Sequence, residues 1–164
     1  MKKINFHSFS GYVTEIQDFI IGQPEEAGCN KLVTVVNEAG AIVNFIVSPD
    51  TYVADHAMIA VGDIVTGYYD GNAPTILIYP PQYPAIVMVK VSRHREIKVD
   101  FFNQNLESSD GQLQLNLTPS VPILLTNGQV FSNHPSNRNL VVFYGPATKS
   151  IPAQTTPYKI IVLC

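Results

Sequence analysis

The sequence predicts an all-β protein built from two copies of one strand-rich unit, and three observations support this fold class. Residues 42–51 (Ile-Val-Asn-Phe-Ile-Val-Ser-Pro-Asp-Thr) return in a fainter form at residues 112–121 (Gln-Leu-Gln-Leu-Asn-Leu-Thr-Pro-Ser-Val). After each copy the chain shows the same order of features: a strand that ends in tyrosine, a proline-rich stretch and a closing aliphatic strand. Short β-branched runs bounded by glycine and proline fill both halves, and helical periodicity is almost absent. A repeated order without a shared reactive side chain indicates a duplicated structural unit.

The first half begins with a strand and a hairpin. Apolar and polar residues alternate over residues 11–16, as in a half-buried strand. An acidic, glycine-containing loop follows at residues 18–30. The β-branched runs at residues 31–37 and 41–47 lie on either side of Glu38-Ala39-Gly40, so we expect a hairpin with a three-residue or bulged turn.

The remainder of the first half alternates between loops and strands. Residues 51–60 have a weak helical period that allows one or two turns at most, and a strand resumes over residues 61–69. Four prolines between residues 70 and 84 remove backbone donors that a central strand needs. We therefore expect a long ordered loop there, followed by a closing strand at residues 85–89.

The second half repeats this order. A strand is expected over residues 96–102, and Asp110-Gly111 and Asn127-Gly128 each predict a tight turn because both dipeptides tolerate positive φ angles. Residues 141–145 and 159–163 correspond to the tyrosine-ending strand and the closing strand of the first half. A second proline-rich stretch lies between them.

Five strands in each half, in this order, fit a small Greek-key barrel of the OB type, in which closure removes exposed sheet edges. The sequence predicts two such barrels in tandem, at residues 1–91 and 92–164. A β-sandwich made from the same strands is the alternative. Units of this size are marginally stable alone, so we expect the copies to support each other or to lean on neighbouring subunits.

Composition and charge narrow the classes of protein. The chain is 46% hydrophobic and 14% charged, which favours a folded core over disorder. A net charge of −3 gives no field that attracts a polyanion, and we interpret the basic residues at 90–98 as a solvated link, so nucleic acid is a minor hypothesis. No export signal and no apolar span long enough for membrane insertion is visible. The location stays open between the cytoplasm and a spore or cell surface.

The two cysteines, Cys29 and Cys164, lie in a polar loop and at the last position. They lack metal-ligand spacing and are too few for a disulfide framework. Cys164 follows an aliphatic run and is expected to be a small buried hydrophobic residue. If the protein assembles outside the cell, both thiols are candidates for disulfides between subunits.

Three segments of the first half carry a resemblance to a known module. They are residues 44–52 (Asn-Phe-Ile-Val-Ser-Pro-Asp-Thr-Tyr), 61–70 (Val-Gly-Asp-Ile-Val-Thr-Gly-Tyr-Tyr-Asp) and 78–83 (Ile-Tyr-Pro-Pro-Gln-Tyr). These segments resemble a tandem OB-like β-barrel module of spore-forming Gram-positive bacteria that has no assigned activity. The second half resembles it only in the order of its elements. The resemblance implies a β-barrel and a cell-surface or spore-surface setting, and it brings no catalytic residues.

No reactive constellation is visible in the sequence. The four histidines are scattered, and none has the spacing that brings imidazoles onto one metal. Asp50, Asp55 and His56 are the nearest approach to a cluster, and turn capping explains the aspartates more simply. Ser48 and Ser120 lack a nearby histidine or a nucleophile elbow. We therefore expect a protein that is not an enzyme and has no metal or cofactor.

Tyrosines surround both proline-rich stretches and are the candidate binding residues. In OB barrels the loop between the last two strands borders the usual binding face, where aromatic rings stack on bases or sugars. Packing of the tyrosines on prolines is the simpler interpretation. The candidates are Tyr68, Tyr69, Tyr79, Tyr83, Tyr144 and Tyr158.

These observations favour a non-catalytic structural or adaptor protein. Its tandem barrels are expected to mediate self-association or surface assembly, with filament formation as one form, and its partners are copies of itself or a surface protein. The alternative is an OB-type binding module for an oligosaccharide or a single-stranded nucleic acid.

Overall fold

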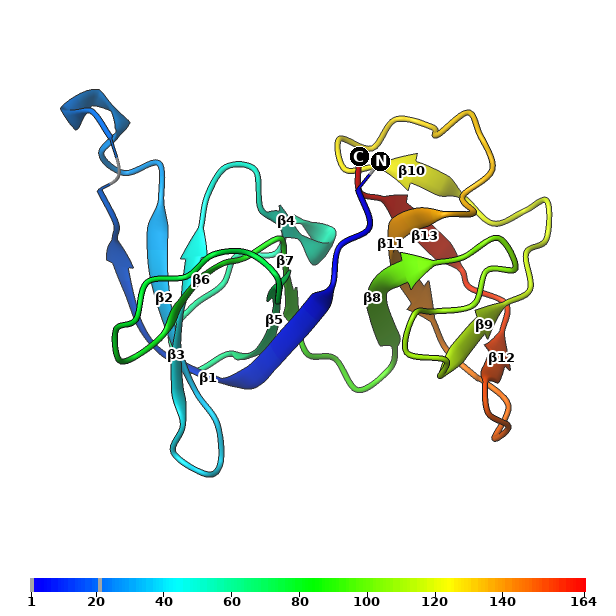
Figure 1. Ribbon diagram of the computed structural model, residues 1–164, viewed down its shortest axis with the longest axis horizontal. Helices are drawn as coiled ribbons and strands as arrows, with labels where there is room; N and C mark the ends of the chain where they lie inside the picture. The colour runs from blue at the N-terminus through cyan, green and yellow to red at the C-terminus, as the bar shows by residue number, and fades with distance from the viewer. Residues whose placement is uncertain (1, 21) are drawn as a thin grey trace. The chain divides into compact units, whose positions relative to one another are not determined.

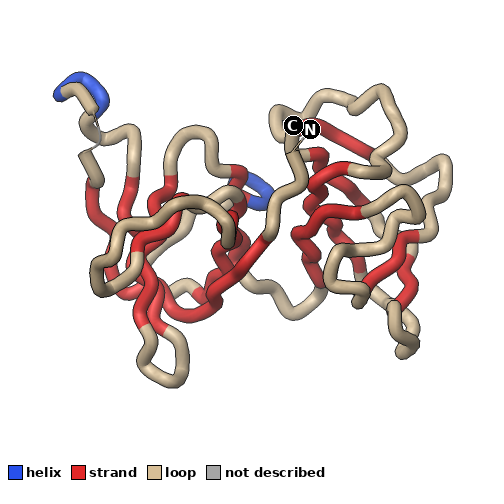
Figure 2. Tube along the Cα trace, in the orientation of Figure 1, coloured by secondary structure: helices blue, strands red, loops and turns tan. Residues whose placement is uncertain are grey.

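The computed structural model describes residues 2–20 and 22–164 (Figure 1). Strands and loops account for almost all of these residues, and the helices there are two single turns of 3₁₀ helix, η1 (Pro24–Glu26) and η2 (Ala54–His56) (Figure 2). The prediction of an all-β protein is confirmed. The chain divides into two compact units. The first unit is His7–Val91, and the second unit combines Ser92–Cys164 with the residues that precede His7.

The first unit contains one mixed seven-stranded sheet with the strand order β4-β7-β5-β1-β2-β3-β6. β2 and β3 form the expected antiparallel hairpin, and β7 runs antiparallel to β5. The two end strands pair in parallel, β4 with β7 and β6 with β3. The strands are β1 (Phe6–Asp18), β2 (Lys31–Val36), β3 (Ile42–Val47), β4 (Tyr52–Val53), β5 (Ile64–Asp70), β6 (Gln82–Pro84) and β7 (Val87–Lys90).

The turn between β2 and β3 has the predicted three residues. The Asn37 N–H donates to the Ala41 carbonyl at 3.0 Å, and the Gly40 N–H donates to the Asn37 carbonyl at 3.0 Å. Gly40 has a φ of 83°, a conformation that glycine adopts without steric cost.

The core of the first unit follows the period of two that strands impose. Alternate residues of β2 and β3 point inward, and Phe45 is completely buried at the centre. Gly67 on β5 lies against the Phe45 ring, because a Cβ at this position would come within 2.4 Å of the ring. The buried residues of this core are Val13, Val33, Val35, Val43, Phe45, Val65, Ala85 and Met88.

Two parts of the first unit differ from the sequence prediction. The expected long loop at residues 70–84 ends in β6. The helical turn that the sequence allowed at residues 51–60 is present as η2, but β4 precedes it in the same segment. Both strands are only two or three residues long, so no periodicity reveals them, and β6 even contains a proline. They are held by partners distant in the sequence: the Tyr52 N–H donates to the Ile86 carbonyl at 2.9 Å.

The second unit contains a four-stranded sheet with the order β10-β13-β11-β8 and a two-stranded sheet, β12-β9. β11 runs antiparallel to both β8 and β13, and the pairs β10–β13 and β9–β12 are parallel. Phe102, Leu140 and Ile160 are among the completely buried residues of its core. The strands are β8 (Glu96–Phe102), β9 (Leu113–Leu115), β10 (Ile123–Leu125), β11 (Arg138–Tyr144), β12 (Ala153–Thr155) and β13 (Lys159–Val162).

Both tight turns expected in the second unit are present. The Ser108 N–H donates to the Leu113 carbonyl at 2.8 Å across the Asp110-Gly111 turn. The Leu125 N–H donates to the Gln129 carbonyl at 2.7 Å across Asn127-Gly128.

None of the sheets among the described residues is closed into a barrel. The sheets are mixed, and a sandwich-like arrangement, the alternative that the sequence left open, fits them.

Candidate binding surfaces

Two of the candidate tyrosines stack on each other in the first unit. The rings of Tyr69 on β5 and Tyr83 on β6 are parallel within 2°, with centroids 3.9 Å apart. His7 meets Tyr69 edge-on at 5.9 Å, and the Phe45 ring lies 6.2 Å from Tyr69. Burial raises the pKa of the Tyr69 hydroxyl, and Tyr83 raises it further. Each of the stacked rings therefore has one face occupied by the other ring.

The remaining candidates do not extend this stack into a platform. Tyr68 is half-buried on β5, and Tyr79 is 77% exposed in the β5–β6 loop. In the second unit, burial raises the pKa of the half-buried Tyr144, with a further contribution from Glu96. Tyr158 is 49% exposed, and its ring lies 6.2 Å from that of Phe143.

Three members of the basic segment are engaged within their own units. The Lys90 ammonium lies 3.3 Å from the Asp63 carboxylate, and Lys98 forms an ion pair with Asp110. The Arg95 guanidinium lies 5.4 Å from the centroid of the buried Phe143 ring. The predicted solvated link is therefore only partly solvated, because these three side chains contact groups of their own units.

Both cysteines are exposed and free. The expectation that Cys164 is a buried hydrophobic residue is wrong, because the strand β13 ends at Val162 and the last residue lies beyond it. Cys29 lies in the loop after η1, where its N–H donates to the Glu26 carbonyl at 3.0 Å. Exposure makes either thiol available to a neighbouring molecule.

A run of exposed apolar side chains, which we did not predict, lies between β5 and β6. It consists of Ile76, Leu77, Ile78 and Tyr79, here called the apolar loop, and Leu77 is fully exposed. Hydrogen bonds fix its two ends, because the Ala73 N–H donates to the Asp70 carbonyl and the Asn44 N–H to the Pro81 carbonyl. Contiguous exposed apolar surface of this kind marks interaction sites. Three consecutive aliphatic residues between prolines were the available signal in the sequence.

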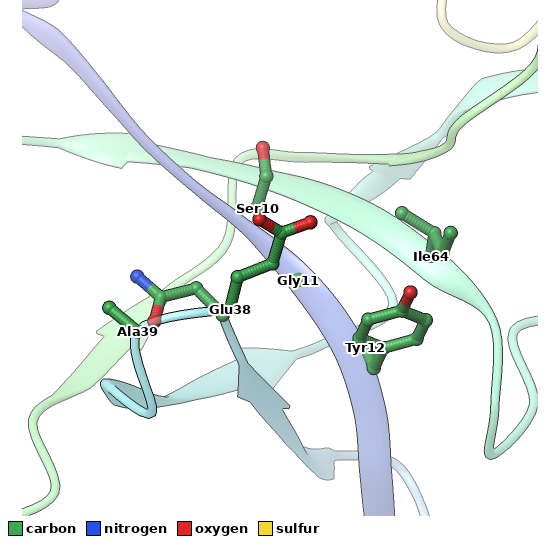
Figure 3. Close-up of a pocket in the computed structure, with 7 residues that line it drawn as sticks. Ser10, Gly11, Tyr12, Glu38, Ala39 and Ile64 are labelled. Carbon is green, nitrogen blue, oxygen red and sulfur yellow. The ribbon is translucent and has the colours of Figure 1, made fainter.

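A shallow hollow of about 440 Å³ lies elsewhere on the first unit (Figure 3). Ser10, Gly11 and Tyr12 of β1 form one side, Asn37, Glu38 and Ala39 of the β2–β3 turn form another, and Ile64 of β5 completes it. Tyr12 and Ile64 are each about half exposed there. Glu38 is the one ionisable carboxylate of this lining, and no histidine, cysteine or basic side chain accompanies it.

The described residues contain no group of three or more histidine, cysteine or acidic side chains that could hold a metal ion. Neither of the short helices in the described parts has the length or apolar character that a membrane span requires.

Comparisons of the chain with protein-family models, with curated proteins and with solved structures gave no match.

Proposed function

We propose that this protein is a non-catalytic structural or adaptor protein whose two β units mediate self-association. The observation that carries the proposal is the apolar loop, which presents three large aliphatic side chains and a tyrosine to solvent from a loop anchored at both ends. Water contact with such a surface is unfavourable, and association removes it.

Approximate free energies show how much burial of the apolar loop would contribute to association. Ile76 and Ile78 are already partly buried, at 63% and 45% exposed. Complete burial of these two and Leu77 would therefore contribute roughly 3–6 kcal/mol, at about 1.5–3 kcal/mol for a fully exposed side chain. Association costs about 4–15 kcal/mol in lost freedom of motion. The loop therefore supplies a binding centre, and a stable assembly needs further contacts around it.

We also propose that each unit is an OB-like unit, as the sequence suggested. The hydrogen bonds of residues 82–90 support this finer assignment for the first unit. The Ala85 N–H donates to the Ile46 carbonyl of β3, and the next N–H, that of Ile86, donates to the Tyr68 carbonyl of β5. One chain segment thus passes from β3 to β5, which is the connection that closure of a five-stranded barrel requires.

The second unit supports the same assignment. Residues 153–162 pair in parallel with β9 through β12 and antiparallel with β11 through β13. The Asn116 N–H donates to the Thr155 carbonyl at 2.9 Å, and the Tyr158 N–H donates to the Phe143 carbonyl at 2.9 Å.

Light scattering of the full chain over a range of concentrations tests the self-association. We expect the average mass to rise with concentration for the natural sequence. A variant with Ile76→Ser, Leu77→Ser and Ile78→Ser should shift this rise to at least about tenfold higher concentration, which corresponds to about 1.4 kcal/mol. The matched control carries Val130→Ser and Ile151→Ser, which remove exposed apolar side chains of the second unit. A natural sequence that stays monomeric at every concentration contradicts the proposal.

A module that binds an oligosaccharide or single-stranded nucleic acid is the second candidate. The exposed rings of Tyr79 and Tyr158 favour it, because open aromatic faces stack on sugars and bases. The mutual stacking of Tyr69 and Tyr83 disfavours it, since those rings cover each other. Binding of a glycan or oligonucleotide that is lost with Tyr79→Ala and retained with Tyr69→Phe would support this function over self-association.

The two exposed thiols give the main proposal a further consequence in an oxidising location. In an oxidising location, such as a spore or cell surface, Cys29 and Cys164 are suited to disulfides between subunits. We expect assemblies taken from such a location to dissociate further on gels with reductant than without it.

A further inference from the structure

A buried amide in the second unit binds the start of the chain. Asn139 on β11 is 2% exposed. Its Oδ1 accepts a hydrogen bond from the Ile4 N–H at 3.1 Å, and its Nδ2 donates to the Lys2 carbonyl at 2.8 Å. The Lys3 ammonium lies 5.3 Å from the ring centroid of Phe101, the residue on β8 that pairs with Asn139. Residues 2–5 are here called the N-terminal arm.

In this contact the side chain of Asn139 recognises the backbone of the N-terminal arm. A primary amide has an acceptor oxygen and a donor NH₂ group, so it can pair with both the N–H and the carbonyl that a strand edge presents. The arm uses the N–H of one residue and the carbonyl of the residue two positions earlier, which lie on the same side of an extended chain. Neither hydrogen bond involves a side chain of the arm.

The site depends on the arm. Without it, Asn139 would lose both of these hydrogen bonds, and the loss of hydrogen bonds to a side chain that is buried in the folded chain destabilises the fold. Asn139 is therefore the centre of a built site for an extended segment.

The arm and its site are far apart in the sequence. The two hydrogen bonds join residues separated by 135 and 137 positions. The arm continues at Phe6 directly into β1, whereas the site belongs to β8 and β11 of the second unit. Whichever copy of the site holds the arm, the same two hydrogen bonds and the same cation–ring contact form.

We infer that Asn139 and Phe101 form a docking site for the N-terminal arm of a second copy of the chain, which replaces the arm of the same molecule. An exchanged arm links the first unit of one molecule to the second unit of another. Because exchange substitutes identical contacts, no contact energy is lost and the remaining cost is that of association. Repeated exchange gives either closed pairs or open chains. This inference rests on the proposed self-association and names the segment that connects the copies.

Mixing two complementary variants tests the exchange. The first variant, Asn139→Leu, keeps the arm and loses the amide that binds it. The second variant lacks residues 1–5 and keeps the site. Only the arm of the first can occupy the site of the second, so native mass spectrometry of the mixture should show a one-to-one heterodimer. We expect this heterodimer to be about tenfold tighter than either homodimer, the effect of losing hydrogen bonds to a buried group.

Two further changes define the control. Ile4→Pro in the Asn139→Leu chain removes the N–H that donates to Asn139 in the partner, and it should reduce the heterodimer about tenfold. Ile4→Ala keeps this N–H and should leave most of the heterodimer. If Asn139→Leu does not fold, Asn139→Asp replaces it, because aspartate lacks the donor to the Lys2 carbonyl.

The outcomes separate the inference from the proposed function. A mixture with no more heterodimer than homodimer overturns arm exchange, even where light scattering shows that the natural chain self-associates. A heterodimer that depends on the Ile4 N–H establishes exchange, even where the apolar-loop variant associates as strongly as the natural chain and the loop is not the contact.

Discussion

The two units share a pattern of strand pairing but differ in the surfaces they present. In the first unit β7 pairs antiparallel with β5 and parallel with β4, and in the second unit β13 pairs antiparallel with β11 and parallel with β10. The pair β3–β6 has its counterpart in β9–β12, and both are parallel. The duplicated order of the sequence therefore corresponds to a duplicated connectivity, while the loops have diverged.

The proline-rich loops show this divergence most clearly. The loop of the first unit exposes Ile76, Leu77 and Ile78 in succession. The corresponding loop of the second unit is held by polar contacts: the Thr148 N–H donates to the Gln154 carbonyl at 2.9 Å, and the Ser150 hydroxyl donates to the Pro152 carbonyl at 2.8 Å. The second loop exposes one large aliphatic side chain, Ile151, whereas the first exposes three in succession, which is why the proposed contact is placed on the first unit.

The core phenylalanines of the two units should contribute about equally to the free energy of unfolding. Phe45 and Phe102 are each completely buried in the core of their own unit. Phe45→Ala and Phe102→Ala should each lower the free energy of unfolding by about 3–5 kcal/mol, since each leaves a large cavity. Urea unfolding followed by circular dichroism measures both. Val130→Ala, at an exposed position, is the control. A near-neutral effect at one phenylalanine would show that the two units do not have comparable cores.

Substitution of a tightly packed glycine by alanine should lower the free energy of unfolding by a smaller amount. Gly67→Ala would place a Cβ 2.4 Å from the Phe45 ring, which is buried and cannot move away. We expect it to lower the free energy of unfolding by about 1–3 kcal/mol. Gly145→Ala, at the end of β11, meets no atom within 4 Å and should be nearly neutral. Equal effects of the two substitutions would contradict the packing described for Phe45.

Two turns, one from each unit, contain a carboxylate that should make the stability of the fold depend on acidic pH. In the first, the hydrogen bond from the Ala60 N–H, with a further contribution from Lys90, holds the pKa of Asp63 below its usual value. In the second, burial opposes ionisation of Asp110, but hydrogen bonds from Lys98 and Ser108 outweigh it and lower the pKa. Both carboxylates therefore stabilise the fold above their unfolded pKa of about 4, and this stabilisation is lost as the pH falls through the lowered folded pKa.

Asp63→Asn and Asp110→Asn should each reduce the loss of stability on acidification. Asp100 acts in the opposite sense, because burial raises its pKa, so its ionisation opposes folding as the pH rises through about 4. Chemical unfolding at a series of acidic pH values measures the slope. A variant whose stability falls as steeply as that of the natural chain would show that the carboxylate contributes nothing.

Local patterns in the sequence predicted the local structure well. The β-branched runs around Gly40 and the turns at Asp110-Gly111 and Asn127-Gly128 depend on near neighbours, and these elements form as expected. Strands β4, β6 and β12 were missed, because two or three residues carry no period and long-range partners hold them in place.

The candidate surfaces were only partly visible in the sequence. The tyrosines near the first proline-rich stretch were recognised as a group, but mutual stacking of Tyr69 and Tyr83 depends on the pairing of β6 with β3. The contact between Asn139 and the N-terminal arm spans most of the chain, so no local pattern predicts it. A lone asparagine in the apolar run of residues 139–143 was the only signal.

Hydrogen–deuterium exchange of the full chain at low and at high concentration tests the central claim most directly. If the apolar loop is the contact between copies, amides of residues 76–79 should exchange more slowly at high concentration, while the exchange of amides in the corresponding loop at residues 148–154 should be unchanged. Exchange in residues 76–79 that is independent of concentration, measured where light scattering shows assembly, would contradict the account.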